Sequence, residues 1–309
     1  GDVVNTDKLS KKLGCEVVEI SALKGTGIME AANKAIEIAS KKAEAPVHEF
    51  AASVESAITS VENKLGTDVK EEQKRFFAIK LIEKDDKIND KTYYYYDAIG
   101  SDEVGTGDFF GPIIVSATLV NKENRKLLED LKIMDSKKMT DDKIRRCAPI
   151  LMSKIPYVTF TLSNKKYNEL SNKGFNMNKI KAILHNRVLY ELSNKGIPYH
   201  KIIVDQFTTP RSYFSYLKQE NITDKVTKIT FLTKGESKHL SVAAASVISR
   251  YLFLQEMDKL SQKYGIAIPK GAGTNVDAVG KDIVKKYGKL ELDNIAKTNF
   301  KNTEKILNN

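Results

Sequence analysis

Four acidic residues in the second part of the chain lie where predicted strands end. Asp102 and Glu103 close one apolar run, Asp205 ends the run IIVD, and Glu236 follows another strand in TKGESKHLS. Acids at the ends of neighbouring strands can converge, and converging carboxylates stay ionised only when a cation neutralises them. Oxygen-only ligands favour Mg²⁺ or Mn²⁺. We therefore predict a divalent-metal site; the alternative is that these acids are caps, turn residues or surface charges.

Glycines surround the adjacent acidic pair in GSDEVGTGDFFG, residues 100–111. Neighbouring residues of an ideal strand point to opposite faces, so Asp102 and Glu103 could share a metal only if the strand ends or distorts between them. We expect Gly105 and Gly107 to supply that break. Glycine also lets the backbone of a ligand come close.

The net charge of +10 is unevenly distributed along the chain. Residues 1–92 carry 15 Lys and Arg against 17 Asp and Glu, whereas the remaining residues carry 35 against 23. The second part, with a net charge of +12, is a plausible polyanion binder, although a solvated lysine-rich surface is the alternative. A metal–carboxylate site in a basic domain indicates phosphodiester hydrolysis, in which two ions clamp the attacking water and the leaving oxygen.

Composition excludes several classes of protein. The two cysteines, Cys15 and Cys147, are far apart and in no zinc-like spacing, so neither a disulfide nor a zinc site is expected, and a reducing cytoplasm fits. No stretch approaches 18 uninterrupted apolar residues, which argues against a membrane span, and no signal peptide is recognised.

Hydrophobic patterning predicts an α/β fold for the second part. Strands are expected at 93–104, 111–120, 157–162, 200–207 and 225–232, and helices at 178–193, 239–262 and 276–288. Strands that come first and then alternate with helices indicate a mixed sheet flanked by helices. In the first part we expect a short strand at 15–22, helices at 28–43, 50–65 and 69–83, and a charged linker at 83–91.

Five motifs in order resemble ribonuclease HIII, a type 2 ribonuclease H, over about residues 93–309. They are IGSDEVGTGDFFGPIIVSA, DSKKM, VDQF, KGESKHLSVAAASVISR and FKNTEK. The resemblance implies a ribonuclease H fold and cleavage of the RNA strand of RNA–DNA hybrids with two Mg²⁺ or Mn²⁺ ions. It also implies products with 5′-phosphate and 3′-hydroxyl ends, and a monomer without an obligate protein partner.

The resemblance assigns metal binding and catalysis to the four acids. Asp102 and Asp205 would bridge or ligate both ions, while Glu103 and Glu236 would complete the ligand shells. Glu236 matches a glutamate of this family that is aspartate in the sister ribonuclease HII, and Thr106 stands where ribonuclease HII has arginine. Cutting at single ribonucleotides in DNA, as in ribonuclease HII, is the alternative activity.

The resemblance also implies contacts with the nucleic acid. These are assigned to Gly105, Thr106, Gly107, Lys137, Lys138 and Lys238, and for each lysine an ordinary surface charge is the alternative. His239 is expected to start a helix or to pack, and a role in product release is the alternative. His185 belongs to no motif and is expected to be structural or exposed, and Ser246 is expected to be small for helix packing.

Residues 1–88 resemble another family, the cytosolic part of the ferrous-iron transporter FeoB. KLSKKLGCEVVEISALKGTGIMEAANKAIE resembles the end of its GTPase domain, and RFFAIKLIEKDDKI resembles the helical region that follows. Residues 1–88 contain no phosphate-binding GxxxxGKS/T and no NxxD, so GTP hydrolysis is not expected of this part. We divide the chain into a truncated GTPase-like fragment at 1–45, a helical segment and linker at 46–92, and a ribonuclease H-like catalytic domain at 93–309. A guanine-nucleotide or iron-transport module is the alternative function.

Overall fold

The computed structural model describes residues 5–13, 15–21, 25–40, 50–65, 69–83, 96–133 and 139–308. The chain forms two compact units, Gly1–Glu83 and Lys84–Asn309. This division lies close to the boundary predicted between the helical segment and the catalytic domain. The predicted linker at 83–91 lies almost entirely outside the described residues.

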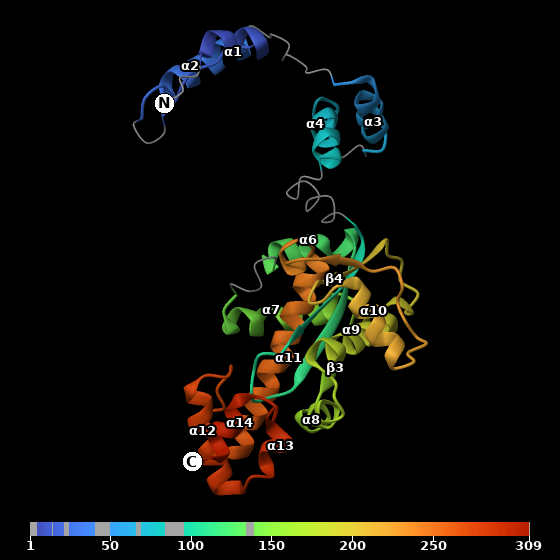
Figure 1. Cartoon of the computed structure of the whole chain (residues 1–309), viewed down its shortest axis with the longest axis vertical. Helices are drawn as coiled ribbons and strands as arrows, with labels where there is room; N and C mark the ends of the chain where they lie inside the picture. The colour runs from blue at the N-terminus through green and yellow to red at the C-terminus, as the bar shows by residue number, and fades with distance from the viewer. Residues whose placement is uncertain are drawn as a thin grey trace. The chain divides into compact units, whose positions relative to one another are not determined.

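The described part of the first unit is helical (Figure 1). Its helices are α1 (Thr6–Leu13), α2 (Ile28–Ser40), α3 (Ala52–Glu62) and α4 (Glu71–Ile82). Ile58 of α3 and Ala78 of α4 are buried, and Arg75 donates two hydrogen bonds to Glu55 at 2.8 and 2.9 Å. The three helices predicted here are confirmed.

The short strand predicted at 15–22 is wrong. Residues 16–20 have no regular secondary structure, and an isolated bridge between Ser21 and Thr26 is the pairing found there. A strand needs a neighbouring backbone to satisfy its amides and carbonyls. The apolar run CEVVEIS has no such neighbour among the described residues of this unit.

The second unit is built on a five-stranded mixed sheet, as predicted. Its strands are β1 (Ala98–Val104), β2 (Ile113–Val120), β3 (Tyr157–Leu162), β4 (Lys201–Asp205) and β5 (Thr230–Leu232). The order across the sheet is β3-β2-β1-β4-β5, with β1, β2 and β3 antiparallel and β4 and β5 parallel to β1. The last strand is shorter than the predicted 225–232.

Helices flank this sheet. They are α6 (Lys122–Asp130), α7 (Asp141–Lys154), α8 (Asn164–Asn172), α9 (Met177–Ser193), α10 (Pro210–Gln219), α11 (Leu240–Tyr264), α12 (Thr274–Tyr287), α13 (Glu291–Ile295) and α14 (Lys301–Leu307), with a 3-10 turn η2 (Gly235–Ser237) before α11. The predicted helices at 178–193, 239–262 and 276–288 correspond to α9, α11 and α12.

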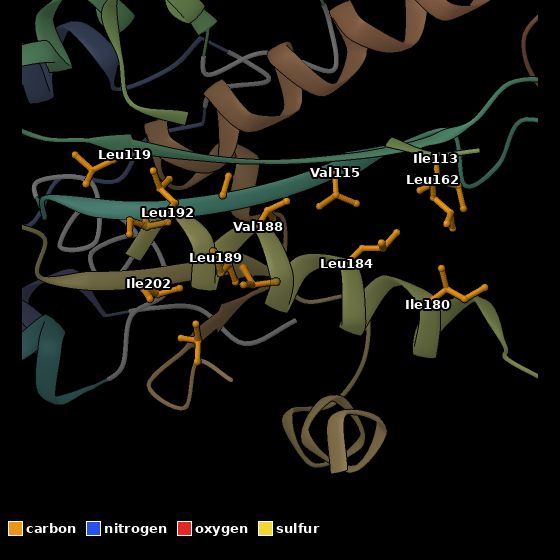
Figure 2. Packing of buried hydrophobic residues seen from close by; sticks show 14 of the residues in the cluster. Ile113, Val115, Leu119, Leu162, Ile180, Leu184, Val188, Leu189, Leu192 and Ile202 are labelled. Carbon is orange, nitrogen blue, oxygen red and sulfur yellow. The ribbon is translucent and has the colours of Figure 1, made fainter. Parts of the chain in front are cut away.

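The long helices α9 and α11 pack against the sheet and contribute many of its buried contacts. The apolar side of α9 packs against β2, as Figure 2 shows for Leu184 and Val188 opposite Val115. Helix α11 approaches β1 closely: a Cβ at Gly100 would lie 2.3 Å from Ser241 Oγ and 2.5 Å from the Val242 amide. Because helices cover both sides, β2 is buried at every position instead of alternating.

Candidate active site

The carboxyl ends of three adjacent parallel strands lie at one edge of the sheet. In the register of β1 with β4, Ser101 lies opposite Val204, so the next residues along, Asp102 and Asp205, lie side by side on neighbouring strands. Asp205 in turn pairs with Leu232 at the end of β5. Neighbouring strands run about 4.8 Å apart. The sheet therefore brings together two of the four predicted acids.

The turn η2 carries Glu236 to the same edge. The amide of Gly235 donates to Asp205 Oδ1 at 2.7 Å. A Cβ at position 235 would lie 3.3 Å from the Asp205 Cα, so glycine permits this close approach. Glu236 follows directly and is only 5% exposed. The backbone just before Glu236 is therefore held by a hydrogen bond to the Asp205 carboxylate.

Asp102 is under electrostatic stress. Burial raises the pKa of Asp102 well above its ordinary value, and the charges of Glu103 and Asp205 raise it further, while hydrogen bonds from Ser246 and from the Glu103 amide oppose the rise. An added positive charge at this point would relieve that stress. Ser246 lies on α11, so it has a polar role here in addition to the small size predicted for it.

Glu103 is directed to α9 instead. Lys181 Nζ lies 2.5 Å from Glu103 Oε1, and His185 Nε2 lies 2.8 Å from Glu103 Oε2. Burial alone would raise the pKa of Glu103, but the hydrogen bond and charge of His185 and the charge of Lys181 hold it at about 2. Glu103 is thus ionised over the whole physiological range.

His185 and Lys181 are site residues that the sequence reasoning missed. His185 is fully buried, as a structural histidine would be, yet its Nδ1 lies 2.8 Å from Ser101 Oγ and its other nitrogen contacts Glu103. A carboxylate can only accept, so Nε2 donates to it. The available signal was a lysine and a histidine four residues apart on the otherwise apolar side of α9.

The strand stays regular at the two adjacent acids, and the predicted break at the glycines is confirmed at Gly105, directly after β1. β1 stays paired with β2 through Asp102, Glu103 and Val104, which lie opposite Ser116, Val115 and Ile114. The break comes one residue later, at Gly105. Because the pairing is regular, Asp102 contacts Ser246 of α11 whereas Glu103 contacts α9.

The metal-ligand geometry that was predicted for the four acids is not preformed. Within the described ranges, no three acidic, histidine or cysteine side chains already lie close enough to hold a metal ion. The donor chemistry nevertheless fits a hard divalent cation, because Asp102 and Asp205 are neighbouring carboxylates, and burial together with the charges of Glu103 and Asp205 raises the pKa of Asp102.

The glycine-rich loop turns sharply just past the acids. Gly105 has φ +91°, and a Cβ there would lie 2.2 Å from the carbonyl oxygen of Pro112, so only glycine fits. Gly107 is exposed with open space around it. In the described part of the chain, the amides of Thr106 and Gly107 donate to no protein acceptor. Exposed amides of this kind can receive a phosphate.

Lys297 anchors this loop from beneath. Its buried Nζ donates to the carbonyl oxygens of Asp108 at 2.8 Å and Gly111 at 2.6 Å. Burial lowers the pKa of Lys297 to about 7, although the Asp108 charge opposes the change. The Gly271 amide adds a further hydrogen bond to this loop, donating to Asp108 Oδ1 at 2.6 Å. The loop that presents the free amides is therefore rigidly held.

A pocket of about 300 Å³ lies between β1, α11 and this loop. It is lined by Glu103, Val104, Asp108, Ile144, Ser246, Arg250, Phe253, Leu254 and Lys270. Arg250 and Lys270 both bind the carboxylate of Asp141, so two basic groups are held at one side of the pocket. Neither was singled out from the sequence.

The predicted lysine contacts are only partly placed. Lys137 and Lys138 lie outside the described residues. Lys238 directly follows η2, where its amide donates to the Gly235 carbonyl at 3.0 Å. Its contact with a phosphate remains a prediction. The neighbouring His239 caps α11: its Nδ1 accepts from the Ser241 amide at 3.0 Å, and its Nε2 donates to the Tyr96 carbonyl at 3.1 Å. The helix-start role predicted for His239 is confirmed.

Comparison with known proteins supports this description of the second unit. A family model described as Ribonuclease HII matches residues 99–303. Ribonuclease HIII of Phytoplasma mali (strain AT) is 50% identical over 210 residues, which cover 68% of this chain and 72% of that protein. Ribonuclease HIII of Bacillus cereus (strain ATCC 14579) is 45% identical over 211 residues, 68% of each chain.

Solved structures show the same fold. The crystal structure of Bst-RNase HIII in complex with Mn²⁺ aligns with a TM-score of 0.68 at 41% identity, covering 71% of this chain and 71% of that one. Aquifex aeolicus RNase H3, at 24% identity and a TM-score of 0.54, shares the fold. A ribonuclease H-like sheet flanked by helices is thereby confirmed.

The first unit has a different relative. A family model described as the FeoB cytosolic helical domain matches residues 50–98, which include α3 and α4. This match confirms the predicted resemblance of the helical segment to FeoB. Helices of the described residues are also too short or too polar to cross a membrane. On the strength of its longer second unit, the chain belongs to the type 2 ribonuclease H family, in its ribonuclease HIII branch.

Proposed function

We propose that the second unit is an endoribonuclease that hydrolyses the RNA strand of RNA–DNA hybrids with the help of two divalent metal ions. The observation that carries this proposal is the alignment of Asp102 with Asp205 at one sheet edge, next to the turn that holds Glu236. Burial and the charges of Glu103 and Asp205 raise the pKa of Asp102, and a strongly shifted carboxyl group at a strand end is typical of a functional site. Membership of the ribonuclease HIII branch supports the same activity.

Asp102, Glu103, Asp205 and Glu236 would hold Mg²⁺ or Mn²⁺. Bound divalent ions would supply the positive charge that activates a water molecule and stabilises the charge developing on the phosphate. Asp205 is oriented for this task by the Gly235 amide, and Asp102 by Ser246 and the Glu103 amide. The chain thus fixes the direction of two carboxylates before a metal arrives.

The glycine-rich loop would receive the nucleic-acid backbone. Gly107 is exposed with open space beside its Cα, and Lys297 and Gly271 hydrogen-bond to Asp108 of the same loop. Lys238 would add phosphate affinity that falls with salt, together with Lys137 and Lys138. The 2′-hydroxyl distinguishes RNA from DNA, so we infer recognition of a ribonucleotide close to the four acids.

The test is cleavage of an end-labelled RNA–DNA hybrid by the full chain, with Mg²⁺, with Mn²⁺ and with a chelator. We expect RNA products with 5′-phosphate and 3′-hydroxyl ends when metal is present, and none from Asp102→Asn or with chelator. Asp130→Asn is a suitable control because Asp130 is an exposed residue of α6 that pairs with Lys126. Full activity of Asp102→Asn would overturn the proposal.

Substrate preference and oligomeric state are tested in separate experiments. A duplex with a single ribonucleotide distinguishes hybrid cleavage from the alternative, ribonuclease HII-like activity; we expect the longer hybrid to be preferred, because Thr106 stands where ribonuclease HII has arginine. Sedimentation of the protein with and without hybrid tests our inference that it acts as a monomer. A dimer as the active species would contradict that inference.

A further inference from the structure

Both oxygens of Glu103 are engaged by basic side chains of α9. Lys181 Nζ lies 2.5 Å from Oε1 and His185 Nε2 lies 2.8 Å from Oε2. The side chains of Lys181 and Glu103 are only 12% and 11% exposed. A carboxylate that would serve as a metal ligand is therefore neutralised by groups of the protein itself.

The two side chains that contact Glu103 come from one face of α9, and both pack against the Phe207 ring. Lys181 and His185 are four residues apart, which places them one above the other on the helix. Lys181 Nζ lies 4.2 Å from the centre of the Phe207 ring, and the His185 ring centre lies 5.1 Å from that of Phe207. The arrangement is thus built into the packing of α9 against the segment after β4.

The two partners differ in how firmly they are held. The His185 ring is fully buried, and Ser101 contacts its far nitrogen at 2.8 Å, so the ring is fixed at both ends. Lys181 is held by Glu103 and by the face of Phe207, and its four-carbon chain can rotate without moving the backbone. Of the two, only Lys181 can leave Glu103 at low cost.

We propose that Lys181 is a built-in cation that neutralises Glu103 while no metal is bound and that competes with the metal ion for this carboxylate. His185 keeps Glu103 oriented in both situations, which makes Lys181 and His185 positioning residues. The inference rests on the proposed function, because it requires Glu103 to be a metal ligand. Its consequence is a lower metal affinity than the acids would otherwise have.

The test is a calorimetric titration of the full chain with Mn²⁺ in the absence of nucleic acid. Removing the competing charge in Lys181→Met should tighten Mn²⁺ binding by roughly tenfold, whereas Lys181→Arg, which keeps the charge, should stay close to wild type. Lys179→Met is a matched control. Lys179 is also on α9, its Nζ lies 4.2 Å from the Phe175 ring centre, and it pairs with Glu220, away from the acids.

A second measurement needs no variant. Acetylation of lysines by an amine-reactive reagent, read by mass spectrometry, should label Lys181 slowly in metal-free protein and faster once Mn²⁺ has displaced it from Glu103. Labelling of Lys179 should not change. This arm keeps the inference testable even if Lys181→Met does not fold.

The outcomes separate this inference from the function on which it rests. Tighter Mn²⁺ binding by Lys181→Met alone, with metal-dependent labelling of Lys181, supports it. If wild type binds Mn²⁺ but Lys181→Met binds no more tightly and Lys181 labelling is constant, the inference is wrong and the metal centre stands. If wild type binds no Mn²⁺ at millimolar concentration, both the metal centre and the inference are overturned.

Discussion

Asp102 shows the cost in stability of a carboxylate buried where a metal site is proposed. Its carboxylate is placed among Glu103 and Asp205, and burial and these charges raise the pKa of Asp102. Because the folded state binds the proton more tightly than the unfolded chain does, stability falls as the pH rises above the ordinary pKa of 3.8, so at neutral pH this carboxyl group destabilises metal-free protein.

Asp102→Asn should therefore raise the melting temperature of metal-free protein at neutral pH while lowering hybrid cleavage by about a hundredfold or more. Asparagine keeps an oxygen that can accept from the Glu103 amide, so local structure should survive. Tyrosine fluorescence is a selective probe, because all 13 tyrosines follow residue 92 and tryptophan is absent. A lower melting temperature for this variant, with Asp130→Asn unchanged, would show that the carboxylate is not under stress.

Some site residues were visible in the sequence and others were not, for physical reasons. The four acids stood out because Asp102, Glu103 and Asp205 end apolar runs and Glu236 closely follows one, and charges at such places need an explanation. Lys181 and His185 were hidden because polar residues of an amphipathic helix are ordinarily assigned to its exposed side, whereas these two side chains are buried or nearly so. Their role depends on which side of α9 meets β1, and only the packing determines that.

At the scale of elements, α11 depends on how it begins. His239 closes the first turn: its Nδ1 accepts from the Ser241 amide, and its Nε2 donates to the Tyr96 carbonyl. Burial lowers the pKa of His239 to about 4, with the charge of Arg125 adding to the effect and the Tyr96 hydrogen bond opposing it. The folded protein therefore holds this histidine neutral at pH values where an unfolded chain would protonate it.

The sign of the resulting pH dependence is fixed by the depressed pKa. The stabilisation is complete above the ordinary value of 6.5 and is lost as the pH falls towards 4, by a total of about 3 kcal/mol. His239→Asn keeps a capping oxygen but cannot titrate, so its loss of stability between pH 7 and 4.5 should be smaller than that of wild type. Urea unfolding of metal-free protein, monitored by tyrosine fluorescence, measures the stability of wild type and of His239→Asn at each pH.

The matched variant for that experiment is His200→Asn, because the His200 side chain is 66% exposed and caps no helix. It should retain the acid sensitivity of wild type. Equal slopes for wild type and His239→Asn would mean that other groups cause the acid sensitivity. The prediction belongs to α11 as a whole, since Ala243 to Ala245 pack against the sheet only while the helix begins at the correct residue.

The fold was predictable from sequence for long helices, whose hydrophobic periodicity extends over several turns. It was less predictable for short strands, whose bounds depend on pairing with a neighbouring strand. The helices at 178–193 and 239–262 correspond to α9 and α11 because their apolar patterns persist over several turns. The run at 225–232 yields only the three residues of β5, which pair with Ile203 to Asp205. At the start of the run, the Val226 amide donates to the Asn186 side chain of α9 at 3.0 Å instead of pairing with β4. The apolar run at 15–22 similarly lacks a partner strand among the described residues.

At the scale of the whole molecule, the charge and the predicted site both belong to the second unit. Residues 93–309 carry a net charge of +12, whereas residues 1–92 carry −2. The acids, the glycine-rich loop and Lys238 also lie in the second unit. Affinity for a polyanion depends on the number of phosphates that basic side chains neutralise. We therefore attribute hybrid binding and cleavage to the second unit.

Deletion of residues 1–83 should consequently leave the rate of hybrid cleavage within about twofold of the full chain, and the salt dependence of hybrid affinity should change by less than about one charge. Lys238→Gln in the full chain is the comparison: losing one phosphate contact should lower the logarithmic salt slope by about 1. Filter binding between 50 and 200 mM salt, about a fourfold range, resolves such a difference. A much flatter slope after the deletion would show that the FeoB-like unit contacts the nucleic acid itself, and an unchanged slope for Lys238→Gln would remove that lysine from the phosphate contacts.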